Sequence, residues 1–523
     1  MATVAPPTLE FRNEPFTDFT DADNVRRMEE ALAKVREDFD RTYPLIIGGR
    51  RITEGDVEAS INPAKPSEVV GRMVQCTPEL ALEAIRVADE TFNSWRKVPV
   101  EERADYLFRV ADLMRERKFE LAATMVYEVS KSWAEADGDV AELIDFAEYY
   151  AREALRIGAD QPCVPFPGET NILRYIPLGV GAVIPPWNFP GAIMGGMTMA
   201  AIVTGNTILL KPASTSPVIA AKFVEMLEEV GVPAGVVNFI PGPGSKIGDL
   251  IVDHPRIRFI AFTGSKEVGI RIFERAAKVH PGQIWLKRTI LEMGGKDSII
   301  VDETADLEKA AQGIVQAAWG FQGQKCSACS RAIVVESAYD QVLQRVVELT
   351  KQLPQGDPAQ KGIHNGAVID AKAFRKIHGY IETAQKEGGR LMLGGQKGDE
   401  QDGYFIPNTI IADVKPTDTI SLEEIFGPVL AFIKAKDYDH AMEIANNTEF
   451  GLTGALFSRD RERIERAAED FHCGNLYFNR KCTGALVGVQ PFGGFNMSGT
   501  DSKAGGPDYL LLFTQGKSIT ERL

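Results

Sequence analysis

The sequence of 523 residues is poor in cysteine, in histidine and in long apolar runs, and each shortage excludes a class of protein. Six cysteines are too few for a disulfide framework, so the thiols are free for chemistry. The six histidines form no HExxH or paired metal motif. No apolar run approaches the roughly 20 residues that span a bilayer, and segment 1–21 lacks the features of a secretory signal. We therefore expect a cytoplasmic protein that does not associate with membranes.

Positive charge is also in deficit, with 58 Lys and Arg against 73 Asp and Glu and a net charge of −15. A surface this acidic repels nucleic acid and anionic lipid, so neither is a predicted partner. Hydrophobic residues make up 44% and charged residues 25%, which is typical of a globular protein. The length favours two or three domains.

The hydrophobic periodicity changes along the chain and predicts an α/β fold. Residues 1–19 predict an extended arm, 22–43 an amphipathic helix, 45–52 a short hairpin, and 77–158 a helical region. Strand-like runs then alternate with helical patterns, which predicts parallel βαβ units. One further strand, interrupted by a glycine turn, is predicted over 289–301, and the tail after 508 is apolar enough to pair with another segment. The alternating segments are 179–184, 192–204, 207–211, 217–230, 236–240, 245–253 and 257–262.

Three loops follow predicted strands, at the strand ends where doubly wound sheets bind dinucleotides. Lys211 begins the first loop and is suited to ribose hydroxyls or a phosphate. The second loop, 242–248, is rich in glycine, and the third ends at Ser265, which begins a helix and can present free N–H groups to a pyrophosphate. An ordinary turn also explains the glycine loop, because its spacing is GxGxxxG and not GxGxxG. The three loops together favour a cofactor site.

Cys326 follows a glycine-bearing loop and is the candidate nucleophile. A reactive thiol needs positive charge or N–H donors that lower its pKa, and Lys325 is the adjacent candidate for this role. Two alternatives stay open. Cys326 can be a small buried apolar side chain, or it can form a CxxC redox or metal pair with Cys329, although a single CxxC supplies only half of a zinc site.

Asn188 and Glu292 are candidate partners for this thiol. Prolines around Asn188 restrict its backbone, so its amide can be held as an oxyanion donor, although a turn asparagine is the alternative. Glu292 is flanked by apolar residues and glycines, and burial would raise its pKa toward that of a general base. The alternative for Glu292 is a salt bridge on an edge strand. No serine lies in a GxSxG elbow, which argues against a hydrolase of that type.

Five segments, in order and over nearly the whole chain, resemble the motif series of the NAD(P)-dependent aldehyde dehydrogenase superfamily. They are PWNFP at 186–190, FTGS at 262–265, LEMGGK at 291–296, GQKC at 323–326 and EIFGP at 424–428. The resemblance implies an α/β fold with a Rossmann-like nucleotide-binding domain, an α/β catalytic domain and a small β oligomerisation flap. The implied boundaries are 1–40 for the arm and first helix, 41–158 and 178–290 for the NAD(P)-binding domain, 291–497 for the catalytic domain, and 159–177 with 508–523 for the flap.

The resemblance also implies roles for individual residues. Cys326 would attack an aldehyde carbon, Asn188 would hold the oxyanion, and Glu292 would activate the water that hydrolyses a thioester. NAD is the implied cofactor, and NADP stays open because Ser214 stands where many members carry a glutamate that grips the adenosine ribose. The implied cofactor-binding residues are Ile184, Pro186, Trp187, Lys211, Ser214, Gly244, Gly248, Phe262, Thr263, Gly264, Ser265, Val268, Glu424 and Phe426.

Within the superfamily, segments 323–331, 477–480 and 483–494 are similar to members that oxidise L-glutamate γ-semialdehyde, the open form of 1-pyrroline-5-carboxylate, to glutamate in proline degradation. Glu142 would stand near the substrate ammonium or orient Lys325, and a homo-oligomer, a dimer or an assembly of dimers, is implied. The open alternatives are another semialdehyde such as succinate semialdehyde, a CoA-acylating relative, and a non-catalytic or CxxC protein. The implied substrate-binding residues are Glu142, Phe189, Lys325, Ser327, Gly484, Ala485 and Phe492.

Overall fold

The computed structural model describes residues 10–523, and the part of the predicted arm at 1–9 lies outside them. Residues 10–20 contain no helix or strand, and α1 (Ala22–Glu37) follows them, capped by the Asp21 side chain. The helix ends before residue 43, where it was predicted to end, because β1 (Thr42–Tyr43) instead pairs with β5 (Lys65–Val74). Strands β1, β5 and β4 (Val57–Asn62) form a small sheet that the periodicity did not predict.

The first large sheet has seven strands in the order β12-β11-β8-β9-β10-β2-β3. Strands β8 to β12 are parallel, whereas β2 and β3 form the predicted hairpin at the edge. The predicted βαβ units are therefore confirmed. The strands are β2 (Leu45–Ile47), β3 (Arg50–Ile52), β8 (Val180–Ile184), β9 (Thr207–Leu210), β10 (Val237–Phe239), β11 (Ile257–Thr263) and β12 (Arg288–Glu292), and the connecting helices are α6 (Ala192–Val203), α7 (Pro217–Glu229), α8 (Gly244–Asp253) and α9 (Lys266–Ala277).

The predicted helical region before this sheet divides into four helices. Proline or a tight turn separates α2 (Pro78–Trp95), α3 (Val100–Glu116), α4 (Lys118–Val129) and α5 (Trp133–Gly158). Ser130, with a φ of 60°, ends α4 and separates it from α5. Helix α5 packs against α3, α4 and α6, and α6 connects β8 and β9 of the first large sheet.

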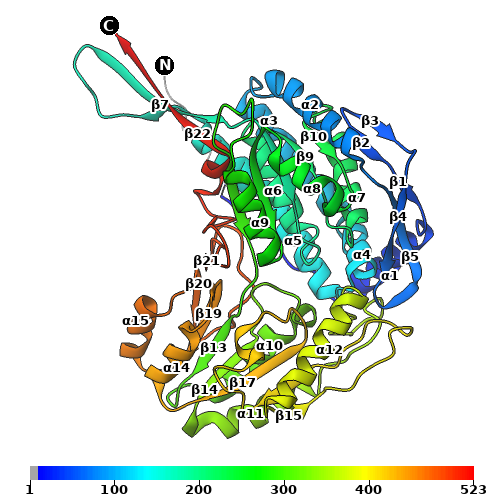
Figure 1. Cartoon of the computed structure of the whole chain (residues 1–523), viewed down its shortest axis with the longest axis vertical. Coiled ribbons are helices and arrows are strands. Elements are labelled where there is room, and N and C mark those ends of the chain that lie inside the picture. The colour runs from blue at the N-terminus through cyan, green and yellow to red at the C-terminus, as the bar shows by residue number, and fades with distance from the viewer. Residues whose placement is uncertain (1–9) are drawn as a thin grey trace.

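The second large sheet lies in the other half of the molecule (Figure 1) and has the order β15-β16-β17-β14-β13-β19-β20. The prediction of one strand over 289–301 is wrong. Residues 288–292 join the first sheet as β12, and β13 joins the second, so the glycine turn between them crosses from one half to the other. The strands are β13 (Ser298–Val301), β14 (Arg331–Val335), β15 (Arg390–Leu393), β16 (Thr409–Ala412), β17 (Val429–Ala435), β19 (Thr453–Phe457) and β20 (Asn475–Phe478), and the helices are α10 (Leu307–Trp319), α11 (Glu336–Thr350), α12 (Ala371–Lys386), α13 (Thr419–Leu422), α14 (Tyr438–Asn446) and α15 (Arg461–Asp470).

A small antiparallel sheet projects from the body as a flap (Figure 1). It contains β6 (Gln161–Pro162), β7 (Glu169–Pro177) and β22 (Thr514–Arg522), with β22 paired to β7 along its whole length. The predicted pairing of the tail is confirmed. Short elements complete the chain: the 3-10 turns η1 (Gly320–Gly323) and η2 (Tyr509–Phe513), and the strands β18 (Phe450–Gly451) and β21 (Phe495–Asn496). Within residues 10–523, no helix is both long enough and apolar enough to span a bilayer.

Candidate active site

The motif segments meet where the two large sheets face each other. The Trp187 ring, just after β8, contacts the rings of Phe426 and Phe321 at centroid distances of 5.4 and 6.3 Å. The Asn188 side-chain amide donates to the backbone carbonyl of Gln324 at 3.0 Å. Segments that are far apart in the sequence therefore converge around the loop that carries Cys326.

This loop has an unusual backbone that the sequence pattern did not reveal. Phe321, Gln322 and Gly323 have φ values of 48°, 55° and 66°, in the left-handed region that side chains other than glycine rarely adopt. The Gln322 amide donates to the carbonyls of Ser130 and Ala367 and holds this conformation. At Gly323 a Cβ would lie 2.4 Å from the carbonyl oxygen of Gly427, so only glycine fits. The reversal fixes the direction in which the chain enters Cys326.

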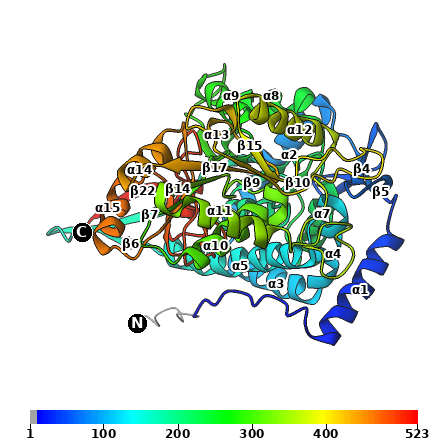
Figure 2. The same cartoon turned by 90° about the horizontal axis from the view of Figure 1, so that it is seen from below.

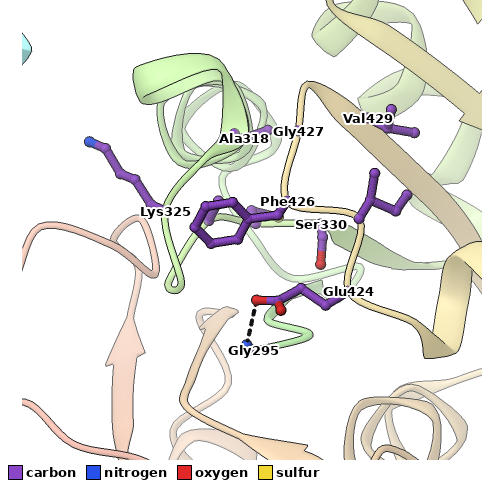
Figure 3. Close-up of a pocket in the computed structure, with 12 residues that line it drawn as sticks. Gly295, Ala318, Lys325, Ser330, Glu424, Phe426, Gly427 and Val429 are labelled. Carbon is purple, nitrogen blue, oxygen red and sulfur yellow. Dashed lines mark hydrogen bonds between the residues drawn. The ribbon is translucent and has the colours of Figure 1, made fainter. Parts of the chain in front are cut away.

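The Cys326 thiol is enclosed, and burial raises its pKa, with further contributions from Asp297, Glu292 and Glu424. The three carboxylates therefore lie within electrostatic reach of the sulfur, as predicted for Glu292. The expectation that Lys325 lowers the thiol pKa is wrong. The Lys325 ammonium pairs with Glu135 at 2.6 Å, and Figure 3 shows its side chain directed away from the pocket.

Glu292 is the last residue of β12 and is buried between the two sheets. Ser502 Oγ donates to Oε1 at 2.6 Å, and Oε2 has no hydrogen-bond partner among the described residues. Burial raises the pKa of this carboxyl to about 8. Within residues 10–523 it makes no ion pair within 4.0 Å, which argues against the edge-strand salt bridge. The raised pKa is that expected of a general base that acts near neutral pH.

Asn188 is 4% exposed, and one N–H of its side-chain amide is left free by the hydrogen bond that positions the side chain. A primary amide carries two N–H groups, and the hydrogen bond to Gln324 uses one of them. The other N–H can stabilise an oxyanion beside the sulfur. The turn-asparagine alternative therefore does not describe this side chain, because its amide bridges two distant segments.

The predicted cofactor residues lie along one edge of the first sheet. Ile184, Phe262 and Thr263 end parallel strands, and Lys211 directly follows β9. Because parallel strands present their carboxyl ends at the same edge, the loops after them are neighbours. Pro186 and Trp187 follow β8, and Gly264 and Ser265 follow β11. Ser214 is exposed in the loop before α7.

This edge fits a dinucleotide. At Gly244 and Gly248, in α8, a Cβ would meet no atom within 4 Å, so the backbone there is open to a ligand. Ser265 caps α9 with its hydroxyl, and Val268 in the first turn of that helix is 45% exposed, which is a suitable apolar contact for a planar base. Burial lowers the pKa of Lys211, whose ammonium would be stabilised by a bound anion.

Glu424 and Phe426 close the other side of this site. Glu424 Oε1 accepts a hydrogen bond from the Gly295 backbone N–H at 3.0 Å, shown dashed in Figure 3. The two residues line a small pocket with Gly295, Gly323 and Gly427, next to the Cys326 loop. Phe426 has a φ of 59°, which turns the chain toward Trp187.

The predicted substrate end is built from buried ion pairs that sequence reasoning missed. Lys131 pairs with Asp139 at 2.8 Å, and both side chains are fully buried. The Lys131 ammonium lies 4.0 Å from the centroid of the Phe189 ring and the Lys325 ammonium 5.9 Å. Glu135 and Asp139 stand four residues apart on α5, so they share a face. Acidic residues at a spacing of four, on a helix that also buries many apolar side chains, are the signal that could have identified them.

Glu142 lies three residues beyond Asp139, on the same side of α5. Burial raises its pKa to about 8, as does the charge of Asp139, while Lys131 acts in the opposite direction. The proposal that Glu142 orients Lys325 is wrong, because Glu135 does so. Its alternative role, beside a substrate ammonium, stays a prediction.

The predicted carboxylate anchor also comes together. Ser327 Oγ lies 2.8 Å from Thr483 Oγ1, directly before Gly484 and Ala485. Gly484 has a φ of 79°, and a Cβ on it would lie 3.6 Å from the ammonium of Lys481, a cation that sequence reasoning did not single out. Phe492 exchanges backbone hydrogen bonds with Ala504 at the far end of this loop.

The CxxC alternative is not supported by the contacts of Cys329. The Cys329 thiol is buried and donates to the Arg331 carbonyl. It also lies beside the Cys482 thiol and raises the pKa of that group. Among the described residues, no group of three or more His, Cys, Asp or Glu side chains is arranged to hold a metal ion.

Comparisons with known proteins identify the family of this chain. A family model described as the aldehyde dehydrogenase family matches residues 52–519. The 1-pyrroline-5-carboxylate dehydrogenase of Geobacillus sp. (strain WCH70) is 63% identical over 511 residues, 98% of this chain and 99% of the relative. A Thermus 1-pyrroline-5-carboxylate dehydrogenase with bound NAD is 51% identical, with a TM-score of 0.96 over 100% of both chains. The NAD⁺ complex of a betaine aldehyde dehydrogenase from Staphylococcus aureus is 28% identical, with a TM-score of 0.88 over 95% of this chain and 97% of the other.

Proposed function

This chain belongs to the aldehyde dehydrogenase family, and from that premise we propose that it oxidises L-glutamate γ-semialdehyde to L-glutamate with NAD. One observation carries the proposal: the Cys326 thiol shares its site with the Glu292 carboxylate, whose Oε2 has no hydrogen-bond partner among the described residues, and with the spare amide donor of Asn188. The names of the relatives point to the same substrate, since it is the open form of 1-pyrroline-5-carboxylate.

In the proposed reaction, Cys326 Sγ bonds to the aldehyde carbon, and its proton leaves through the Glu292 carboxylate to solvent. The Asn188 amide and the Cys326 backbone N–H stabilise the oxyanion. Residues such as Lys211, Ser265 and Glu424 would hold the nicotinamide cofactor, which would supply the acceptor for the hydride that leaves the substrate carbon as the thioester forms. Glu292 then takes a proton from water, whose oxygen attacks the resulting thioester, and the carbon–sulfur bond breaks to release the acid.

Charge at the far end of the site supports an amino-acid aldehyde as the substrate. Ser327 and the backbone N–H groups of Gly484 and Ala485 suit the α-carboxylate, and Glu142 suits the α-ammonium. An ammonium beside Glu142 would lower its raised pKa and keep it ionised. Succinate semialdehyde has the carboxylate but no ammonium, so Glu142 favours the glutamate derivative. Phe189 and Phe492 would enclose the aliphatic stem.

A specificity panel tests the proposal. We expect NADH formation with glutamate semialdehyde to exceed that with succinate semialdehyde or propionaldehyde by at least about tenfold in kcat/KM, because each lacks charged groups that the site would pair. Equal values across the three substrates would contradict the assignment. The same assay with NADP in place of NAD measures the cofactor preference that Ser214 leaves open.

We also propose the domain division given above, with the boundary between the two α/β domains moved from 290 to the end of β12 at Glu292, and a role for the flap in assembly. The role of the flap is supported by two of its apolar side chains, Val164 and Phe166, which are 88% and 63% exposed. Apolar side chains this exposed are typical of a subunit contact. A homo-oligomer is expected, and a single-subunit mass in light scattering at micromolar protein would contradict this part of the proposal.

A further inference from the structure

The N-terminal arm, residues 10–20, contacts two parts of the proposed substrate site. One is helix α5, and the other is the proposed carboxylate-anchoring loop, residues 483–490. Figure 2 shows the dark-blue arm running beneath α3 and α5 before it enters α1. The arm contains no helix or strand, so side-chain contacts hold it in place. Arg115 of α3 pairs with Glu14, and Lys118 of α4 donates to the Pro15 carbonyl. The remaining contacts fall into two groups, one to α5 alone and one to both α5 and the loop.

Asn13 makes the contact that joins the two. Its Nδ2 donates to Asp145 Oδ2 on α5 at 2.7 Å and to the backbone carbonyl of Val487 in the loop at 3.0 Å. The neighbouring Glu14 N–H donates to the other carboxylate oxygen of Asp145 at 2.6 Å. Asp145 is buried, so loss of the Asn13 amide would leave a buried carboxylate oxygen and a loop carbonyl without this donor.

Phe11 covers the same loop from outside. Its ring packs edge-on against Tyr149 of α5 at 5.2 Å. Gly488 has a φ of 75°, and a Cβ there would lie 3.1 Å from a Phe11 ring atom, so the loop backbone is in close contact with the arm. The arm thus limits outward movement of the segment that begins at Gly484.

Thr17 belongs to the other group of contacts. Its backbone N–H donates to Asp137 at 2.8 Å and its hydroxyl donates to the same carboxylate. Asp137 lies on α5, and within residues 10–523 Thr17 makes no hydrogen bond to the loop. The arm therefore offers one residue that bridges helix and loop and another that bonds to the helix alone.

We propose that Asn13 is a positioning residue for substrate binding, which holds the loop 483–490 against α5 so that Gly484 and Ala485 are placed for the substrate carboxylate. Helix α5 carries Glu135, the partner of Lys325, and Glu142 on its active-site side. Arm, helix and loop then act as one unit that sets affinity for the amino-acid end of the substrate. This inference rests on the proposed function, because it needs a substrate with that end.

The test compares Asn13→Ala with its matched control Thr17→Val. For Asn13→Ala we expect KM for glutamate semialdehyde to rise about tenfold, equivalent to about 1.4 kcal/mol. Inhibition by the product L-glutamate, competitive with the aldehyde, should weaken by the same factor. The KM for NAD and the kcat/KM for propionaldehyde should stay within about twofold, since neither uses the loop. Thr17→Val should lower the Tm without changing either substrate constant.

Equal effects of the two variants on KM, or an unchanged KM and L-glutamate inhibition in Asn13→Ala, would overturn the proposal. If Asn13→Ala does not fold, Phe11→Ala carries the test, because it removes the ring that packs over Gly488 and against Tyr149 and should show the same selective rise in KM. The wild-type specificity panel is scored separately. A wild type without preference for glutamate semialdehyde refutes the proposed function, whereas a selective wild type with an unaffected Asn13→Ala refutes only the role of the arm.

Discussion

Two regions of the active site differ in whether their charged side chains have partners. Around the thiol, Glu292 has an oxygen without a partner and Lys296 has an ammonium without one among the described residues. Around Phe189, the cations are paired, Lys131 with Asp139 and Lys325 with Glu135. Lys325 belongs to the second region and the adjacent Cys326 to the first, so the two regions meet in one loop.

The two regions also differ in the pKa values of their ionisable side chains. Burial raises the pKa of Glu292 to about 8 and lowers that of Lys296 to about 7, so both can change protonation near neutral pH. Burial also disfavours ionisation of Glu135, but the ammonium groups of Lys325 and Lys131 outweigh it and lower the pKa of that carboxyl. Unpaired burial produces groups that move protons, whereas paired burial produces fixed charges that hold a shape. The first region suits chemistry and the second suits binding.

The largest effect should come from removing the sulfur. Cys326→Ala should lower kcat for NADH formation by at least about 10⁴-fold, because no other nucleophile faces the substrate carbon. Cys329→Ala is the matched control and should keep most of the activity, since its thiol contacts Arg331 and Cys482 instead. Loss of turnover in a folded Cys329→Ala protein would show that the reactive region extends to the second cysteine.

The next largest effect should come from the oxyanion donor. Asn188→Ala should lower kcat by about 10²- to 10³-fold, because it removes an amide that acts on the transition state. NAD binding, followed by protein fluorescence, should be unchanged and is the control for folding. A rise in KM with an unaltered kcat would place Asn188 in the binding region instead of the reactive one.

The pH profile sharpens the comparison further. Glu292 acts as a base only when ionised, and its ionised fraction grows as pH rises through its pKa of about 8. We therefore expect kcat to rise about 50-fold between pH 6 and pH 8 and then level off. Glu292→Gln should remove this inflection along with most of the rate. A profile that keeps the same inflection in Glu292→Gln would assign it to another group.

The smallest effect should come from the paired region. Glu135→Gln leaves the Lys325 ammonium without its partner, and KM for glutamate semialdehyde should rise about tenfold with a lower Tm. The kcat for propionaldehyde should change little, since this small substrate does not reach the ion pairs. Glu30→Gln, which breaks an exposed pair with Arg26, should leave both quantities unaltered. A large fall in kcat for Glu135→Gln would erase the distinction between the regions.

Sequence reasoning succeeded where the signal is local. The alternation of strand and helix from 179 to 262 appears in the structure as parallel strands with helical connections, since residue periodicity reflects burial within a single element. Asn188, Glu292 and Cys326 were predicted differently, from the chemistry of short motifs and from the resemblance to a family. Reasoning failed at the glycine turn after Glu292, because two short strand-like runs on either side of a turn carry no information about which sheet each of them joins.

What the sequence by itself determined is the set of elements and the chemistry available at their ends, because backbone hydrogen bonding and hydrophobic periodicity act over short distances along the chain. Only the tertiary structure decided which charges are paired and which are not. Lys325 binds Glu135, 190 positions away, and not the thiol beside it. An ion pair of that separation depends on how α5 packs against the Cys326 loop, and the same packing, by excluding water, sets the pKa of Glu292.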